Sequence, residues 1–206
     1  MNRKIMIEQH LRGRDITDPR VLAAMNAVPR ERFVPGHLET MAYGDHPLPI
    51  GEGQTISQPY IVALMTQALD IQTGERVLEI GVGCGYQTAV FCEMGAVVFG
   101  VEIHEPLRVS AQARLEALGY GGFSLKTGDG HLGWADKGPY DAILVAAAPE
   151  TVPQPLLEQL TPGGRLILPE GPCEGVQKLN LYRKNRDLSV SKHTLIHVRF
   201  VPLIEP

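Results

Sequence analysis

Three glycines stand at alternate positions in this chain, Gly81, Gly83 and Gly85, and they follow an apolar segment. An acid, Glu79, precedes the first of them by two residues. Glycine lets the backbone turn sharply and lets a ligand approach without a Cβ in the way. Loops that bind dinucleotides have the spacing G-x-G-x-x-G, with the last glycine beside a pyrophosphate. Here the spacing is G-x-G-x-G and Tyr86 follows, which favours a nucleoside cofactor with no phosphates and a cationic centre.

This loop resembles the first motif of S-adenosylmethionine-dependent methyltransferases, and three acids are placed to serve such a cofactor. Glu79 is expected at the end of a strand, where it would help to hold the aminoacyl end of the cofactor. Glu102 lies about 20 residues past the loop, where a carboxylate can accept hydrogen bonds from both ribose hydroxyls. Asp129 lies between Gly128 and Gly130. We expect its carboxylate to accept a hydrogen bond from the exocyclic amine of adenine, and Gly130 to leave room for the ring.

Each of these acids also has an interpretation without a ligand. Glu79 could be an ordinary acid near a helix, Glu102 a solvated acid after a buried strand, and the G-D-G sequence a turn. The adjacent glycine loop favours the ligand-binding interpretation. No metal site is expected, because no histidine is arranged with these acids, and His193 and His197 lie apart on a predicted strand. Cys84 is interpreted as a small packing residue.

The composition of the chain limits the class of protein. Its 206 residues, 44% of them hydrophobic, suffice for one domain with a buried core. The net charge of −4 implies no basic surface for nucleic acid, and the sequence lacks a run of about 18 apolar residues for a membrane span. Three cysteines without a C-x-x-C pair fit a reducing compartment. We therefore expect a cytoplasmic protein that binds neither nucleic acid nor membrane. A monomer is taken as the expected state, although the composition does not determine the number of subunits.

The glycine loop requires a strand before it and a helix after it, and the hydrophobic pattern supplies both. From Arg76 onward strands alternate with helices, which predicts an α/β fold with a doubly wound, mostly parallel sheet. The last two strands flank Asn185-Arg186-Asp187 and predict an antiparallel hairpin. The N-terminal 70 residues are expected to be helical, with helices from Asp18 and over 58–69, interrupted by a loop over 29–54. The expected strands are 77–80, 97–101, 123–126, 142–145, 165–168 (after a turn at 162–164), 177–184 and 189–200; the helices between them run through Val90, from Leu107 to Leu118, and through Leu160.

The segment before the glycine loop carries the most specific resemblance. It runs from Ala42 through Gly51 and on into Gly53-Gln54-Thr55-Ile56-Ser57-Gln58-Pro59. With it, the chain closely resembles the protein-L-isoaspartate O-methyltransferase family over essentially its whole length. One small departure is Cys84, where the family often has Ser. The other matching segments are 28–35, 128–130, 139–143 with 146–148, 159–169 and 198–203.

The resemblance implies a Rossmann-like methyltransferase fold and the repair of damaged proteins. The family methylates the free α-carboxylate of L-isoaspartyl residues, and the ester collapses to a succinimide whose hydrolysis partly restores aspartate. Isoaspartyl-containing proteins and peptides are thus the expected partners, and S-adenosylmethionine is the expected cofactor. An α-carboxyl has an ordinary pKa of ~3.5, so the nucleophile is already ionised and no general base is required. Alignment of oxygen, methyl and sulfur is then the main source of catalysis.

By resemblance, Ser57 is the family's active-site serine, and we assign it to orienting the substrate carboxylate or the loop over the cofactor. The residues alone favour Ser57 as an N-cap for the following helix, whereas the resemblance favours the functional role, and both roles can hold. Thr55 and Ile56 are expected to contribute loop backbone to both ligands. Tyr43 and Asp45 are left outside the site. The predicted cofactor-binding residues are Thr55, Ile56, Glu79, Gly81, Gly83, Gly85, Glu102, Asp129 and Gly130.

The resemblance divides the chain into two parts within one domain. Residues 1–70 form the acceptor-site extension, and residues 71–206 form the cofactor-binding core with its hairpin. The tail at 200–203 is a candidate for binding the peptide through its main chain, and closure of the 36–54 loop over the substrate is a hypothesis. The alternatives are a methyltransferase of this fold with another acceptor, such as a small molecule or RNA, and a non-catalytic binding protein of this fold. The glycine spacing argues against a nicotinamide-dependent oxidoreductase.

Overall fold

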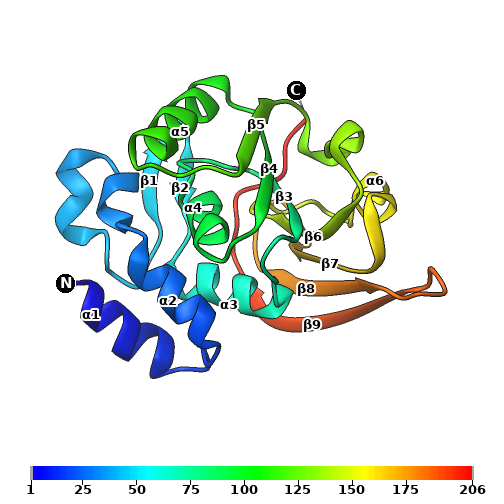
Figure 1. The fold of residues 1–206 in the computed structure, drawn as a ribbon, viewed down its shortest axis with the longest axis horizontal. Coiled ribbons are helices and arrows are strands. Elements are labelled where there is room, and N and C mark those ends of the chain that lie inside the picture. Colours follow the sequence, from blue (N-terminus) through cyan, green and yellow to red (C-terminus); the bar gives the residue numbers. More distant parts are fainter. Residues whose placement is uncertain (1, 206) are drawn as a thin grey trace.

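The computed structural model describes residues 2–205, and within this range a seven-stranded sheet has the strand order β5-β4-β3-β6-β7-β8-β9 (Figure 1). Strands β3 to β7 are parallel, and β8 and β9 continue the sheet as antiparallel strands. This confirms the predicted doubly wound, mostly parallel sheet and its C-terminal hairpin. The strands are β3 (Arg76–Ile80), β4 (Val97–Glu102), β5 (Phe123–Thr127), β6 (Tyr140–Val145), β7 (Leu160–Glu170), β8 (Gln177–Lys184) and β9 (Val190–Val198).

The strand order reverses at β3, which lies between β4 and β6, so that later strands are added on both sides of it. Residues 77–80 of β3 are all buried, because both faces of the strand are covered. That is why the strand reads as a nearly continuous apolar run rather than as an alternating pattern. In open α/β sheets, ligands bind at such a switch point, beyond the carboxyl ends of the strands.

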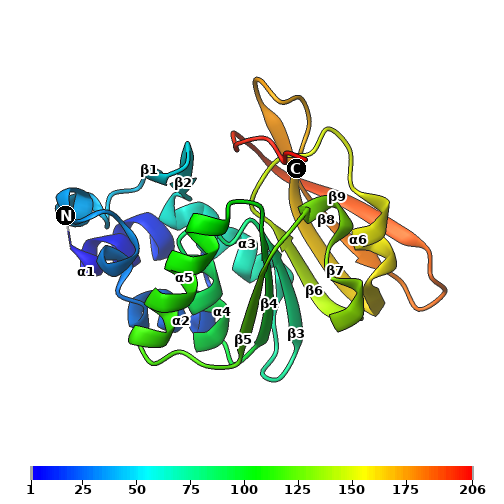
Figure 2. The ribbon, with the colours of Figure 1, turned by 90° about the horizontal axis from the view of Figure 1, so that it is seen from above.

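Helices cover both faces of the sheet. α2, α4 and α5 lie on one face and α6 lies on the other (Figure 2). The buried side chains form two clusters, one that joins the N-terminal helices to α4 and one that surrounds Leu156 of α6. The helices are α1 (Arg3–Ile5), α2 (Pro19–Ala27), α3 (Pro59–Leu69), α4 (Tyr86–Glu93), α5 (Glu105–Ala117) and α6 (Gln154–Glu158), with a π-helical segment at Met6–Arg12 and short 3-10 helices at Arg30–Phe33, Gly36–Met41, Gly130–Leu132 and Ala135–Lys137.

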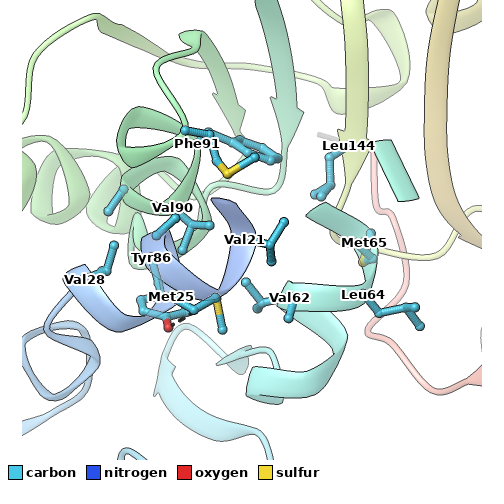
Figure 3. Close-up of a cluster of buried hydrophobic side chains, with 14 of the residues drawn as sticks. Val21, Met25, Val28, Val62, Leu64, Met65, Tyr86, Val90, Phe91 and Leu144 are labelled. Carbon is cyan, nitrogen blue, oxygen red and sulfur yellow. Dashed lines mark hydrogen bonds between the residues drawn. The ribbon is translucent and has the colours of Figure 1, made fainter. Parts of the chain in front are cut away.

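The N-terminal helices share their hydrophobic core with the sheet. α2 begins as predicted, since the Asp18 carboxylate accepts a hydrogen bond from the Arg20 amide at 2.8 Å and Pro19 occupies the first turn. Side chains from α2, α3 and α4 meet in one cluster that also contains Leu144 of β6 (Figure 3). The N-terminal helices are therefore packed directly on the core that carries the glycine loop. Members of this cluster include Val21, Met25, Val28, Val62, Met65, Tyr86, Val90 and Phe91.

Two predictions for the N-terminal part are wrong. The segment 29–54 is not a loop throughout, because β1 (Leu48–Gly51) pairs with β2 (Gln54–Ile56) in an antiparallel hairpin. Strands of four and three residues are too short to produce a readable period. Ser57 is not an N-cap, because Pro59 takes the first helical position of α3 and the cap falls on Gln58, which makes no side-chain capping bond.

The region before β7 also differs from its prediction. Residues 162–164 do not form a separate turn, and they lie within β7 as an irregularity opposite β6. Leu160 pairs with Tyr140, and Arg165 pairs with Ala142, so β7 has extra residues between the two pairs. Glycine at position 163, with φ of +89°, permits this bulge. For the same reason α6 ends at Glu158 and does not extend through Leu160.

Candidate functional site

The carboxyl ends of β3, β4 and β6 meet at one edge of the sheet and border a cavity, which we call the inner cavity. The Gly81 amide donates to the Val101 carbonyl at 2.8 Å, and the Ala146 amide donates to the Ile80 carbonyl at 2.8 Å. These bonds continue the parallel ladder past the ends of the strands and hold the cavity floor in place. Of the predicted site residues, the inner cavity is lined by Thr55, Ile56, Ser57, Glu79, Gly81, Gly83, Glu102 and Gly130.

The glycine loop needs glycine at two places for different reasons. Gly83 has φ of +55°, and a Cβ there would lie 3.1 Å from Cδ1 of Ile50 in β1. Gly85 has φ of +87° and precedes α4, and a Cβ there would lie 3.3 Å from Cβ of Ala111 in α5. Gly83 therefore lets the β1–β2 hairpin close down on the loop, whereas Gly85 lets α4 pack on α5. Gly85 does not line the inner cavity, and its role in binding stays a prediction.

Glu102 connects the glycine loop to the end of β4. The residue is buried, and its Oε2 accepts a hydrogen bond from the Gly83 amide at 2.7 Å. Its Oε1 accepts a hydrogen bond from the His104 amide at 3.0 Å. An ionised carboxylate has about four acceptor positions, so these two bonds leave capacity for hydroxyl donors in the cavity. Glu102 thus both shapes the loop and presents an acceptor to a ligand.

Glu79 is fully buried in β3 and lies at the cavity wall. Its Oε2 accepts a hydrogen bond from Oγ1 of Thr88 in α4 at 2.6 Å, and its Oε1 has no partner among residues 2–205. Burial raises the pKa of Glu79 to about 8, although the bond from Thr88 acts to lower it. A cation placed beside Oε1 would supply the missing partner and favour the ionised form.

The G-D-G sequence after β5 brings its second glycine, but not its acid, to the cavity. Gly130 lines the inner cavity, and a Cβ there would overlap the side chain of Ile80 in β3. Oδ1 of Asp129 accepts a hydrogen bond from the His131 amide at 2.8 Å and lies 3.0 Å from Nδ1 of the same histidine. Asp129 thereby caps the 3-10 helix that follows. Its predicted contact with adenine stays a prediction.

Ser57 lies between β2 and α3 at the junction of two cavities. It lines the inner cavity and also a second one, the outer groove, between the start of α3 and the C-terminal tail. The outer groove has about 690 Å³ of water-accessible space, against about 90 Å³ for the inner cavity. Arg199 is the one Lys, Arg, Asp or Glu among the groove-lining residues of the described chain. The residues that line both cavities are Thr55, Ser57, Ala146 and Val201.

The C-terminal tail forms part of the wall of the inner cavity, which no pattern in the sequence indicated. The Ala148 amide donates to the Val201 carbonyl at 2.8 Å, and the Leu203 amide donates to the Ala148 carbonyl at 2.9 Å. Pro202 and Leu203 consequently line the inner cavity, and Val201 lines both cavities. The two segments involved, 146–148 and 198–203, are both part of the family resemblance. The resemblance could have marked both segments as functional, but it does not reveal that they pair with each other.

The other residues singled out in the sequence have structural contacts. The Tyr43 hydroxyl donates to Glu31 and accepts from Nε of Arg3 at 3.0 Å, and neither Tyr43 nor Asp45 lines a cavity wall described above. Asp45 forms an ion pair with Arg14, with 3.3 Å between Oδ2 and Nη1. Across residues 2–205, no three His, Cys, Asp or Glu side chains gather as a metal-binding group. The same part of the chain has no helix whose length and apolar character would allow it to span a membrane.

Comparison with known sequences gives matches along the whole chain. The family model described as protein-L-isoaspartate(D-aspartate) O-methyltransferase matches residues 1–206. The chain is 54% identical to a protein-L-isoaspartate O-methyltransferase from Opitutus terrae, across 97% of this chain and 85% of the relative. It is 55% identical to one from Methylorubrum extorquens, across 97% of this chain and 86% of the relative.

Solved structures agree in fold. One protein-L-isoaspartate O-methyltransferase superposes with a TM-score of 0.86 at 29% identity, covering 98% of this chain, while this chain spans 65% of that one. A Plasmodium falciparum structure, described as a protein-L-isoaspartate O-methyltransferase in complex with S-adenosyl-L-homocysteine, superposes with a TM-score of 0.82 at 26% identity. That match covers 100% of both chains. The inner cavity and the outer groove thus lie in a fold shared with these proteins.

Proposed function

This chain belongs to the protein-L-isoaspartate O-methyltransferase family, and we infer that its two cavities hold the two reactants of that family's reaction. The inner cavity takes S-adenosylmethionine, and the outer groove takes an isoaspartyl peptide. The enzyme transfers a methyl group to the free α-carboxylate of the isoaspartyl residue, and the ester then closes to a succinimide that hydrolyses in part to aspartate. The observation that carries this assignment is the shared wall, because Ser57, Thr55 and Val201 border both cavities.

The residues around the inner cavity fit this cofactor. Its amino group is a cation, and the unpartnered Oε1 of the buried Glu79 is an acceptor in need of one. Its ribose hydroxyls are donors, and the Glu102 carboxylate has acceptor capacity left beside the glycine loop. When bound, S-adenosylmethionine supplies a methyl group activated by a positively charged sulfur. We assign Thr55, Ile56, Gly81, Gly83, Gly85, Asp129 and Gly130 to the remainder of its binding site.

The outer groove fits a polypeptide. Its walls come from Pro47 and Ile61 on one side and from Phe200 and Val201 on the other. The groove is wide and bears one fixed charge, that of Arg199, which has the sign to attract a carboxylate. Mostly apolar walls and one cation suit a substrate whose flanking side chains vary but whose reacting carboxylate does not.

Ser57 is the residue we assign to the reacting centre. Its hydroxyl makes no hydrogen bond within residues 2–205, and the residue lies where the two cavities join. A free hydroxyl at that point can donate to the acceptor carboxylate and turn one of its oxygens toward the inner cavity. Because the carboxylate is already ionised at neutral pH, Ser57 orients it and takes no part as a base or nucleophile.

We also propose roles for the two parts of the chain, its partners and its compartment. Residues 1–70 act as the acceptor-site extension, and residues 71–206 act as the cofactor-binding core. The partners are isoaspartyl-containing proteins and peptides, with a monomer as the working unit and no role for nucleic acid. The three cysteines, Cys84, Cys92 and Cys173, are free thiols. Free thiols support a reducing compartment such as the cytoplasm.

A matched pair of peptides tests the proposed function. Purified protein is incubated with radiolabelled S-adenosylmethionine and either an isoaspartyl peptide or the same peptide with normal aspartate. We expect base-labile label on the isoaspartyl peptide alone. Cofactor binding without label on either peptide would keep the fold and refute the acceptor. Failure to bind cofactor would refute the assignment of the inner cavity.

A further inference from the structure

Arg30 is a fully buried arginine that connects three parts of the molecule. It begins the 3-10 helix at Arg30–Phe33, and its Nε donates to the Ala42 carbonyl at 2.7 Å. Its Nη2 donates to the Ser57 carbonyl at 2.7 Å. Its guanidinium carbon lies 4.7 Å from the ring centroid of Tyr86, the first residue of α4. The side chain thus joins Ala42 and Ser57, in the N-terminal part of the chain, to the helix that follows the glycine loop.

The positive charge of Arg30 has no carboxylate partner in the described part of the chain. Its bonds go to two neutral carbonyls, and its Nη1 has no partner there. The other well-buried arginine, Arg165, provides the contrast, because both of its terminal nitrogens donate to the Glu75 carboxylate, at 2.9 and 2.7 Å. An unpaired buried cation is costly. The two carbonyl bonds and the ring of Tyr86 compensate part of this cost, and an anion bound in front of Ser57 would compensate more.

Ser57 lies outside the neighbouring strand and helix, so its position depends on the hydrogen bond from Arg30. β2 ends at Ile56 and α3 begins at Pro59, so Ser57 belongs to neither element. The Gln58 cap gives the start of α3 no side-chain bond. Within residues 2–205, one side chain donates a hydrogen bond to Ser57, and it is that of Arg30. A displacement of this carbonyl would move the Ser57 hydroxyl with it, at the junction of the two cavities.

We propose that Arg30 is a positioning residue for methyl transfer, which fixes the main chain of Ser57 and places an unpaired positive charge behind the acceptor carboxylate. The inference rests on the proposed function. The charge lies at a fully buried position and acts across the Ser57 peptide unit, so solvent screens it less than a charge at the surface. Position and charge are separate contributions, and both favour the carboxylate in front of Ser57.

Two substitutions of Arg30 and one of Arg165 test the proposal in the full-length protein. Arg30→Met removes the charge and the forked donor, whereas Arg30→Lys keeps the charge but lacks the planar fork that bonds both carbonyls. Arg165→Lys is the matched control, since it perturbs a buried arginine that lines neither cavity. The measurements are the melting temperature, the dissociation constant of S-adenosylhomocysteine, and kcat and KM with an isoaspartyl peptide.

We expect Arg30→Met to lower kcat/KM by about 100-fold, the size of effect that a small misplacement of a reacting group can cause. Arg30→Lys should recover part of that loss, and the cofactor analogue should bind all variants as it binds the wild type. Arg165→Lys should lower the melting temperature and leave kcat/KM unchanged. Should Arg30→Met fail to fold, Arg30→Lys decides the question by the same comparison. The proposal is overturned if kcat/KM falls no further in the Arg30 variants than in an Arg165→Lys variant of similar melting temperature.

A second peptide separates the charge from the position. Its isoaspartyl α-carboxylate is replaced by a carboxamide, which is neutral and has nearly the same shape. Loss of the Arg30 charge should weaken binding of the carboxylate peptide and leave the carboxamide peptide unaffected. Equal losses for both peptides would refute the role of the charge. A wild-type protein that does not methylate the isoaspartyl peptide refutes the proposed function itself, whereas normal activity in the Arg30 variants refutes only the inference.

Discussion

The two walls of the inner cavity are held in different ways. Glu79, Gly83 and Glu102 lie on or next to central strands, and the parallel ladder and buried hydrogen bonds fix them. Ser57 lies opposite, on a connection between short elements, and a side chain from elsewhere in the sequence holds it. The sheet wall keeps its position through many backbone bonds, so a substitution there removes only what that side chain gives to the cofactor, whereas the position of the Ser57 wall depends on single contacts. We therefore expect substitutions in the sheet wall to affect cofactor binding and substitutions in the Ser57 wall to affect turnover.

The largest effect should come from the sheet wall. Glu102→Ala removes the acceptor for the Gly83 and His104 amides and for the ribose, and a hydrogen bond to a charged group contributes about 1.5–3 kcal/mol. We expect S-adenosylhomocysteine to bind at least ~100-fold more weakly by calorimetry, which corresponds to about 2.7 kcal/mol. Glu105→Gln, at an exposed acid in the first turn of α5, is the control and should bind normally. Unchanged affinity in Glu102→Ala would remove this acid from the site.

The next effect concerns the pH dependence of stability and also lies in the sheet wall. The folded pKa of Glu79, about 8, is above its ordinary value, so the folded state retains a proton that the unfolded chain releases. The free energy of unfolding of the ligand-free protein should therefore fall as the pH rises from about 4.5 to about 8, by at most ~1.4 kcal/mol per pH unit from this group. Glu79→Gln should flatten that slope in urea titrations at several pH values. An identical slope in the wild type and the variant would mean that Glu79 ionises normally in the fold.

The Ser57 wall should show a smaller effect of a different kind. Ser57→Ala removes one donor to a charged acceptor, worth about 1.5–3 kcal/mol, so kcat/KM for an isoaspartyl peptide should fall roughly 10- to 100-fold. Binding of S-adenosylhomocysteine should stay the same, which is the opposite of the Glu102→Ala result. Ser124→Ala, on an exposed position of β5, serves as the control for handling and folding. Loss of cofactor binding in Ser57→Ala would contradict the division of labour between the walls.

The smallest expected effect concerns motion of the segment that covers the cavity. The inner cavity is narrow, with about 90 Å³ of water-accessible space, against about 300–1,000 Å³ for a typical small-molecule site. Ile50 of β1 rests on Gly83, and Gln54 reaches to within 3.4 Å of His104. We expect the 36–54 segment to open for cofactor and to close over the reactants, so that both ligands together slow its proteolysis several-fold. Equal cleavage with and without ligands would indicate that this segment does not move.

The features predicted correctly from the sequence are those in which one residue type satisfies one local structural requirement. The Asp18 cap, the glycine loop and the acids at the ends of β3 and β4 were predicted and lie where expected. The wrong predictions concern residues for which two secondary-structure elements compete. The turn expected at 162–164 became a bulge within β7, because pairing with β6 resumes on both sides of it. Ser57 lost its expected capping role because the proline two residues later displaced the start of α3.

The sequence by itself determined the alternation of strands and helices, the spacing of the glycine loop and the chemical type of the acids beside it. Those properties are local, since hydrophobic period, glycine spacing and capping depend on neighbours within a few residues. Only the tertiary structure decided that Ser57 borders two cavities, that the tail at 201–203 pairs with Ala148, and that the unpaired charge of Arg30 lies behind Ser57. Each of these depends on contacts between segments far apart in the sequence. Such contacts follow from how all the buried surfaces pack at once, and no local pattern in the chain encodes them.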